Sequence, residues 1–177
     1  SGGAGLHRGG NGLSVAYRFL VDGHIGIHDD RWLTYPWGVN GGKPGMRSTK
    51  LLVRSDGTEE YIPAKCEGVK VQKGDLLYFN TWGGGGWGDP LHRDTSIVAS
   101  DVAKGLVSID GAKRYGVVIN DDFSLNKKET ETLRSEMSKD TVKDEMFNFG
   151  GSIEEIKARS LEETNLEPPV SPTFQNQ

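Results

Sequence analysis

The feature that most constrains this chain is a run of four consecutive glycines between two tryptophans, in residues 81–90 (TWGGGGWGDP). The sequence holds 25 glycines in 177 residues, roughly twice the usual share. Glycine loses more conformational entropy on folding than any other residue, so an ordered chain keeps many glycines only where other residues do not fit. We therefore expect this run to pass close to another backbone, a ligand or a tryptophan ring.

Two other glycine-rich segments precede this run, at residues 1–12 (SGGAGLHRGGNG) and 37–45 (WGVNGGKPG). The first offers exposed amides and Arg8, whose planar guanidinium suits a carboxylate or phosphate, so one interpretation is an anion-binding loop. No Gly-Lys-Ser/Thr follows, so the segment is not a P-loop. The interpretation we favour is a structural loop near a subunit contact.

Four further side chains in these segments are candidates for function. Lys43 lies between two pairs of turn-forming residues, and a solvated surface lysine is the simpler interpretation of it. Asp89 precedes a proline, which favours an extended backbone and directs the carboxylate out of the turn. Trp82 and Trp87 flank the glycine run. We assign Arg8, Lys43, Trp82, Trp87 and Asp89 to a substrate-binding or interface loop, and we identify no catalytic residue.

His24 and His28 are weak candidates for a metal site. Residues four apart on a strand share a face, so two imidazoles can meet one ion, with Asp29 or Asp30 as a further ligand. A solvent-facing hairpin followed by a turn at the two aspartates is the alternative that we favour. His7 is isolated, and we interpret it as structural or exposed.

The composition argues against several classes of protein. The net charge is −4, from 21 Lys and Arg against 25 Asp and Glu, which does not suit a nucleic-acid surface. No apolar run approaches membrane-spanning length. The single Cys66 excludes an intrachain disulfide and a Cys-based zinc cage, and it fits a reducing cytosol. Only 34% of the residues are hydrophobic, and the chain opens at Ser1 inside a glycine motif, so we expect a cut segment that relies on a partner.

Strands are expected in the first half of the chain. Alternating apolar and polar residues flank Asp22-Gly23 and again Asp56-Gly57, and each pair predicts a tight hairpin turn because glycine accepts a positive φ. The expected strands are residues 13–21, 24–28, 50–54, 58–62 and 75–80.

Helices are expected in the second half. Asp94, Ser108 and Ser152 stand where they can cap helices, and Gly105 can end the first of them. The expected elements are helices at 95–104, 109–114 and 127–137, a helix after Ser152, and a brief strand at 117–119.

The expected fold class is α+β, with an antiparallel β unit that carries glycine-rich loops, then short helices and an extended C-terminal tail after Pro168-Pro169. Residues 1–92 form the Gly-rich β region and 93–138 a helical region packed on it. Residues 139–177 form a polar helix and a Pro-rich tail. Together they are expected to be one structural domain of a larger subunit.

Several stretches, in this order, resemble the C-terminal region of the hydantoinase B/oxoprolinase family. They are SGGAGLHRGGNG, WGVNGGKPG, GDLLYFNTWGGGGWGDPLHRD, AKRYGVVI and FNFGGSIEEIKARSLEETNLEPP. The resemblance implies the C-terminal part of a B-type subunit of an ATP-dependent cyclic-amide hydrolase, of hydantoinase, oxoprolinase or lactamase type. Acetone and acetophenone carboxylases are also similar, so part of a ketone carboxylase is an alternative, and a catalytically silent assembly module is another.

The resemblance also implies cofactors and partners. ATP and a divalent metal are expected in the full assembly, and none on this chain alone, because the family's metal ligands lie upstream of the matching region. The expected partners are the N-terminal portion of the same B-type subunit and a kinase-like A-type subunit that binds ATP. The expected location is cytoplasmic, and the isolated chain is expected to be inactive. Trp82 and Trp87 stand where the family pattern favours smaller or Tyr-like residues.

Overall fold

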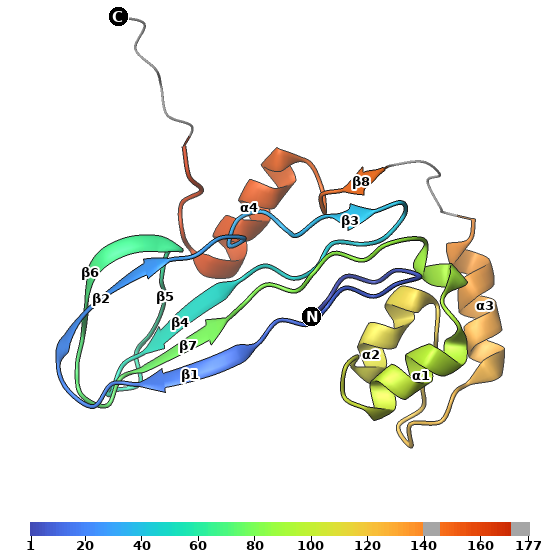
Figure 1. Ribbon diagram of the computed structural model, residues 1–177, viewed down its shortest axis with the longest axis horizontal. Helices are drawn as coiled ribbons and strands as arrows, with labels where there is room; N and C mark the ends of the chain where they lie inside the picture. Colours follow the sequence, from blue (N-terminus) through green and yellow to red (C-terminus); the bar gives the residue numbers. More distant parts are fainter. Residues whose placement is uncertain (140–145, 171–177) are drawn as a thin grey trace, which may run out of the picture.

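A sandwich of two small sheets, a third sheet of two short strands, a bundle of glycine-rich segments and a group of short helices make up the fold (Figure 1). The computed structural model describes residues 1–139 and 146–170. The two sheets of the sandwich lie at one end of the molecule and the three α-helices within residues 95–137 lie at the other, with the glycine-rich segments running between them. The predicted α+β class is confirmed.

The sheets form a small β-sandwich. The first has four antiparallel strands in the order β1-β7-β4-β5, namely β1 (Ser14–Arg18), β7 (Leu76–Asn80), β4 (Thr49–Val53) and β5 (Glu59–Tyr61). The second pairs β2 (Gly23–His28) with β6 (Lys65–Val71). Alternate side chains of both sheets meet in one buried core. The fully buried core residues are Ile27, Leu52, Ile62, Val71 and Leu77.

The first predicted hairpin is wrong. Its two strands exist, but β1 pairs with β7 and β2 pairs with β6, so they lie in different sheets. Gly23 lacks the positive φ that the predicted turn requires. Instead Phe19 packs against the core, and Asp22 Oδ1 accepts a hydrogen bond from Lys73 N at 2.8 Å. Alternating polarity indicates which face of a strand is buried, whereas the choice of partner depends on distant segments.

The second predicted hairpin is confirmed. β4 pairs with β5, Gly57 has a φ of 88°, and Thr58 N donates to Asp56 Oδ1 at 2.9 Å. The strand β6, by contrast, was not predicted. Its pairing with β2 shifts register near Glu67 and Gly68, and this bulge breaks the alternation that would identify a strand.

The three glycine-rich segments (residues 1–12, 37–46 and 81–88) pack as a bundle of extended chains, here called the glycine bundle. Gly84 N donates to Gly10 O at 2.9 Å, and Gly3 N donates to Gly84 O at 2.8 Å. Gly86 N donates to Lys43 O, and Gly86 O accepts from Val39 N, both at 2.9 Å. Residues 81–88 therefore hydrogen-bond to two separate stretches of residues 1–12 and to two separate stretches of residues 37–46. A strand in a sheet, by contrast, has at most two neighbours.

Most of the glycines in this bundle are required by close backbone contacts, although Gly10 has open space where a Cβ would lie. A Cβ on Gly85 would lie 1.8 Å from Trp37 O, and a Cβ on Gly86 would lie 2.1 Å from Ala4 O. This is the same restriction that admits only glycine at the crowded axis of collagen. The expectation that the four-glycine run passes close to another backbone is confirmed.

Helices α1 (Thr95–Ala103), α2 (Ile109–Ala112) and α3 (Lys127–Met137) lie at the far end from the sandwich (Figure 1). Asp94 and Ser108 cap α1 and α2 as predicted. Residues 117–119 are not a regular strand, since Ile119 makes only an isolated bridge to Leu125. Ala4 of the glycine bundle is buried in the core of this helical region, so the bundle and the helices share one packed interior.

Helix α4 (Ile153–Thr164) follows β8 (Phe147–Asn148), which pairs with β3 (Gly38–Val39) in a small third sheet (Figure 1). It contacts the segments before and after β3, since Arg159 Nη1 donates to Tyr35 Oη at 3.1 Å and Glu163 pairs with Arg47. A complete capping box starts it: Ser152 Oγ accepts from Glu155 N, and Glu155 Oε2 accepts from Ser152 N. Most of the tail predicted after Pro169, residues 171–177, lies outside the described residues. No helix of the described ranges has the length and apolar character needed to cross a membrane.

Candidate functional site

The fold brings three of the five predicted loop residues together. Gly86 N donates to Lys43 O, so Lys43 lies opposite the residue that precedes Trp87. A Cβ on Gly41 would lie 3.5 Å from Asp89 N, so the loop that carries Lys43 packs against the segment from Trp87 to Asp89. Trp82 lies at the other end of the glycine run, five residues before Trp87. In an extended chain this separation corresponds to about 16 Å between the two residues.

Trp87 forms a partly exposed aromatic pair with His7. The ring centroids are 5.4 Å apart, the ring planes are inclined by 38°, and Trp87 remains 46% exposed. Backbone hydrogen bonds of 2.9 Å run in both directions between the two residues. The pair therefore presents an aromatic surface on a rigid backbone. His7 was not among the candidates, because a single histidine gives no indication of a ring that lies 80 positions away in the sequence.

Asp89 has the extended backbone that the following proline predicts, with φ −60° and ψ 122°. Its Oδ1 accepts a hydrogen bond from Leu91 N at 2.8 Å and so caps the short helical turn η1 (Pro90–His92). Burial lowers the pKa of the nearby Arg134 guanidinium, and the charges of Asp94 and Asp89 partly oppose this shift. Asp89 therefore has a structural contact and an electrostatic partner.

Arg8 is held by the protein itself. Its Nη1 donates to Gly9 O at 2.8 Å and to Asn11 Oδ1 at 3.0 Å, and its Nε lies 3.6 Å from Asp101 Oδ2 on α1. Arg93 Nη2 donates to the same carboxylate oxygen at 2.8 Å. These contacts tie the first glycine loop to the helices and support the interpretation of a structural loop.

Lys43 differs from Arg8 in having a free charge. Its backbone is fixed in the bundle, since Lys43 N donates to Ala4 O at 2.7 Å. Its side chain is exposed, and within residues 1–139 and 146–170 its ammonium makes no hydrogen bond or ion pair. The position suits either a solvated lysine or a contact with an anionic group outside this chain.

His24 and His28 lie on β2, but the aspartates that follow do not join them. His28 Nε2 lies 2.6 Å from Glu67 Oε1 in an exposed pair across the strands. Asp29 turns into the interior, and Asp30 pairs with a lysine of β6 at 3.3 Å. In the part of the chain that the structure describes, no group of three or more His, Cys, Asp or Glu residues is placed to hold a metal ion.

A buried ionic group was missed by the sequence reasoning. Lys50 Nζ contacts Asp29 Oδ2 and donates to Ser48 Oγ at 2.9 Å, and the Phe79 ring centroid lies 5.2 Å from the ammonium. Lys50 is 1% and Asp29 8% exposed. Because both side chains are buried and paired with each other, we interpret the group as a structural link between the two sheets. Nothing in the local pattern distinguishes Lys50 from a surface lysine.

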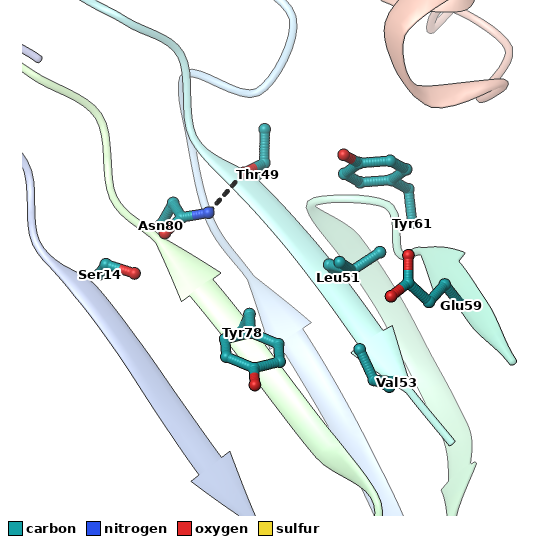
Figure 2. Close-up of a pocket in the computed structure, with 8 residues that line it drawn as sticks. All are labelled: Ser14, Thr49, Leu51, Val53, Glu59, Tyr61, Tyr78 and Asn80. Carbon is teal, nitrogen blue, oxygen red and sulfur yellow. Dashed lines mark hydrogen bonds between the residues drawn. The ribbon is translucent and has the colours of Figure 1, made fainter. Parts of the chain in front are cut away.

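A shallow hollow of about 410 Å³ lies on the outer face of the four-stranded sheet, away from the β2–β6 sheet (Figure 2). The two tyrosines in it, Tyr61 and Tyr78, are 39% and 37% exposed. The residues that line it are Ser14, Thr49, Leu51, Val53, Glu59, Tyr61, Tyr78 and Asn80. The hollow is open and lined by both aromatic and polar groups.

The comparisons with known proteins find a family match in the first half of the chain. The family model described as hydantoinase B/oxoprolinase matches residues 1–90, which contain the whole sandwich and the whole glycine bundle. The β subunit of caprolactamase from Pseudomonas jessenii is 37% identical over 76% of this chain and 24% of its own length. The chain spans about a quarter of the length of this relative and of two others, and 7% of the length of the 5-oxoprolinases that it also matches.

Two solved structures share the fold. The crystal structure of ATP-dependent caprolactamase from Pseudomonas jessenii has a TM-score of 0.58 at 30% identity, over 75% of this chain and 24% of that one. Acetone carboxylase in a nucleotide-free form has a TM-score of 0.60 at 20% identity, over 92% of this chain and 26% of that one. The second likeness is one of fold alone.

Proposed function

Because this chain belongs to the hydantoinase B/oxoprolinase family, we propose that it is the C-terminal part of a B-type subunit of an ATP-dependent cyclic-amide hydrolase. In that assembly it supplies scaffold and subunit interface. The observation that carries the proposal is the family match over residues 1–90, which are the residues that build the sandwich and the glycine bundle. The likeness to the β subunit of a caprolactamase, an enzyme that acts on a cyclic amide, supports the same assignment.

The glycine bundle suits a scaffold. Its three segments are fixed by hydrogen bonds and, at most of their glycines, by contacts that leave no room for a side chain. Residues whose side chains project from it, such as Lys43 and Trp87, therefore have well-defined backbone positions, as residues at a binding surface must. We propose that Lys43, Trp87, Asp89 and the neighbouring His7 form a substrate or interface loop, with Trp82 and Arg8 as separate contacts of the same bundle.

The chemistry of the assembly requires groups beyond this chain. Phosphorylation of an amide oxygen by ATP makes the carbonyl carbon more electrophilic, so the B-type subunit has to position water and stabilise the developing charge. We propose ATP and a divalent metal as cofactors of the full assembly. The residues described here do not suit the metal, since they form no group of three or more ligands, and we place it outside this chain.

The proposed partners are the N-terminal portion of the same B-type subunit and a kinase-like A-type subunit. The coverage supports the first of these, because the curated relatives have about three quarters of their length outside the matching region. We propose a cytoplasmic location on the basis of the single cysteine, which suits a reducing compartment.

The test is an assay of ATP hydrolysis with hydantoin, 5-oxoproline or caprolactam. The chain alone is compared with the assembly that contains the rest of the B-type subunit and an A-type subunit. We expect turnover of at least one cyclic amide by the assembly and none by the isolated chain. Turnover by the isolated chain would overturn the scaffold proposal.

A ketone carboxylase is the second candidate, favoured by the fold likeness to acetone carboxylase over 92% of the chain. In that reaction an enolate attacks carbon dioxide, so bicarbonate-dependent turnover of a ketone by the assembly would select it. If the complete assembly turns over neither a cyclic amide nor a ketone, a catalytically silent assembly module is the remaining interpretation.

A further inference from the structure

The two outer faces of the β-sandwich have opposite character. The outward side chains of β2 and β6 include His24, His28, Glu67 and Lys70, all of them exposed and polar. A face that remains in water has this composition, since antiparallel sheets with one solvated side alternate apolar and polar residues.

The outer face of the four-stranded sheet does not follow this pattern. Tyr78 on β7 lies beside Leu51 on β4, and Leu51 lies beside Tyr61 on β5, so an aromatic and aliphatic row crosses three strands. Val53 continues the apolar surface one step along β4, within the same hollow (Figure 2). Leu52, the neighbour of Leu51 in sequence, points into the core and is fully buried, so the second half of β4 carries apolar residues on both faces.

Polar groups surround this apolar row. Asn80 donates a hydrogen bond to Thr49 Oγ1 at 3.0 Å at one edge of the hollow, and Glu59 lies at another edge. An apolar centre rich in tyrosine, inside a polar rim, is the usual anatomy of a protein–protein interface. A strand that is apolar on both faces is typical of a sheet with both sides covered.

We propose that this outer face, formed by β7, β4 and β5 around Leu51, Tyr61 and Tyr78, is the surface on which the rest of a B-type subunit packs. The assignment rests on the proposed function. Length supports this occupant: the curated relatives have about three quarters of their chain outside the matching region. A contact within one subunit is permanent, and permanent contacts are the ones that place apolar strand faces against each other.

The experiment measures how accessible this face is to a thiol reagent. Single cysteines replace Tyr78 or Tyr61 on the proposed interface, in a background in which Cys66 is changed to Ala. The matched control is His24→Cys, an exposed strand position on the opposite outer face. Each variant is labelled with a maleimide twice, once as the isolated chain and once in the complete B-type subunit, after circular dichroism has shown that the isolated variant keeps its fold.

We expect labelling at positions 61 and 78 to be at least tenfold slower in the complete subunit, with no change at position 24. Equal rates in both forms at both interface positions would overturn the proposal. If the labelling rate of the isolated chain falls as the concentration of that chain rises, the face binds a second copy of the chain. If labelling slows only after an A-type subunit is added, the face binds that subunit. Either of these two results would reject the proposal that the rest of the B-type subunit covers the face. The labelling does not depend on hydrolase activity, so the labelling rates can be interpreted even if the activity assay contradicts the proposed function.

Discussion

At Gly86 the hydrogen atom that stands in place of a side chain points at the carbonyl oxygen of Ala4. The distance of 2.1 Å that a Cβ would have from this oxygen is far below any van der Waals contact, and both groups are backbone. Neither can move without breaking the hydrogen bonds that Gly86 makes to Lys43 and Val39. Because φ at Gly86 is not positive, backbone strain does not require a glycine here. The requirement comes from the neighbouring backbone of Ala4, which is distant in the sequence.

We expect Gly86→Ala to lower the free energy of unfolding by more than about 3 kcal/mol, since the added methyl group overpacks a rigid contact. The matched control is Gly10→Ala, because a Cβ on Gly10 meets nothing within 4 Å and its φ is not positive. We expect that control to change stability by less than about 1 kcal/mol. Urea unfolding followed by tryptophan fluorescence measures both, and equal stabilities would contradict the proposed packing.

Asp75 is a second residue whose role comes from its contacts. Its carboxylate accepts hydrogen bonds from Gln72 N and Ser55 N, each at 2.9 Å, and pairs with Arg54. The Gln72 amide is the main cause that holds the pKa of this buried carboxyl below 3.8, with the Ser55 amide and Arg54 adding to it. A depressed folded-state pKa contributes stability above pH 3.8, and this contribution is lost as the pH falls through the folded value.

We expect the urea midpoint of the wild-type chain to fall as the pH decreases below about 4. Asp75→Asn removes this titration, so the variant is less stable at pH 7 and loses less stability on acidification. Other carboxyls also titrate in this range, so the quantity to compare is the difference between the two proteins at each pH. A difference that stays constant from pH 7 to pH 2 would show that Asp75 does not contribute in this way.

At the scale of elements, the ion pair between Asp29 and Lys50 joins the end of β2 to β4. Asp29 N also donates to Ala64 O at 2.8 Å, next to the start of β6. The contact therefore connects the two sheets at one edge of their shared core. Breaking a buried ion pair is costly because it leaves one charge in the interior without a partner.

We expect Lys50→Met to destabilise the chain by about 3–5 kcal/mol. The double variant Lys50→Met with Asp29→Asn should recover part of that loss, because the remaining group is neutral and can bond to Ser48. Lys70→Met, an exposed position on β6, serves as the control. If Lys50→Met and Lys70→Met prove equally stable in urea, the ion pair does not hold the sheets together.

At the scale of the whole molecule, the family match ends at residue 90, but the packing does not. Ala4 is fully buried among side chains of the helical region, and Asn11 Nδ2 donates to Leu106 O at 2.8 Å. Arg8 and Arg93 both reach Asp101 on α1. These contacts support the proposal that residues 1–92 and 93–138 belong to one structural domain.

We expect a chain truncated after residue 92 to be insoluble or to unfold without cooperativity, because Ala4, Arg8 and Asn11 lose their partners in the helices. A chain that ends at residue 139 serves as the control and should keep a cooperative transition. The measurement is thermal unfolding by circular dichroism, together with the soluble yield. A cooperative transition in the shorter chain would make the β region an independent domain.

Much of the local structure could be predicted from residues that stand next to each other. Asp94, Ser108 and Ser152 begin helices, Asp56-Gly57 turns between β4 and β5, and the four-glycine run lies against other backbones. The same reasoning gave the wrong pairing for β1 and β2 and missed β6. Of the candidate site, the extended backbone of Asp89 was predictable, whereas the ring of His7 beside Trp87 was not.

The sequence by itself determined most of the helices and strands and the turn at Asp56-Gly57, although not β6, and it excluded a P-loop, because backbone sterics, capping and side-chain periodicity act within a few residues. Only the tertiary structure decided the partners of β1, β2 and β7, which carbonyl faces each glycine, and that Asp29 is buried while Asp30 is exposed. These outcomes depend on contacts between segments that lie far apart in the sequence. The four-glycine run shows both contributions. Its composition predicts a close neighbour, and the tertiary structure shows that this neighbour is the backbone of residues 1–12 and 37–46.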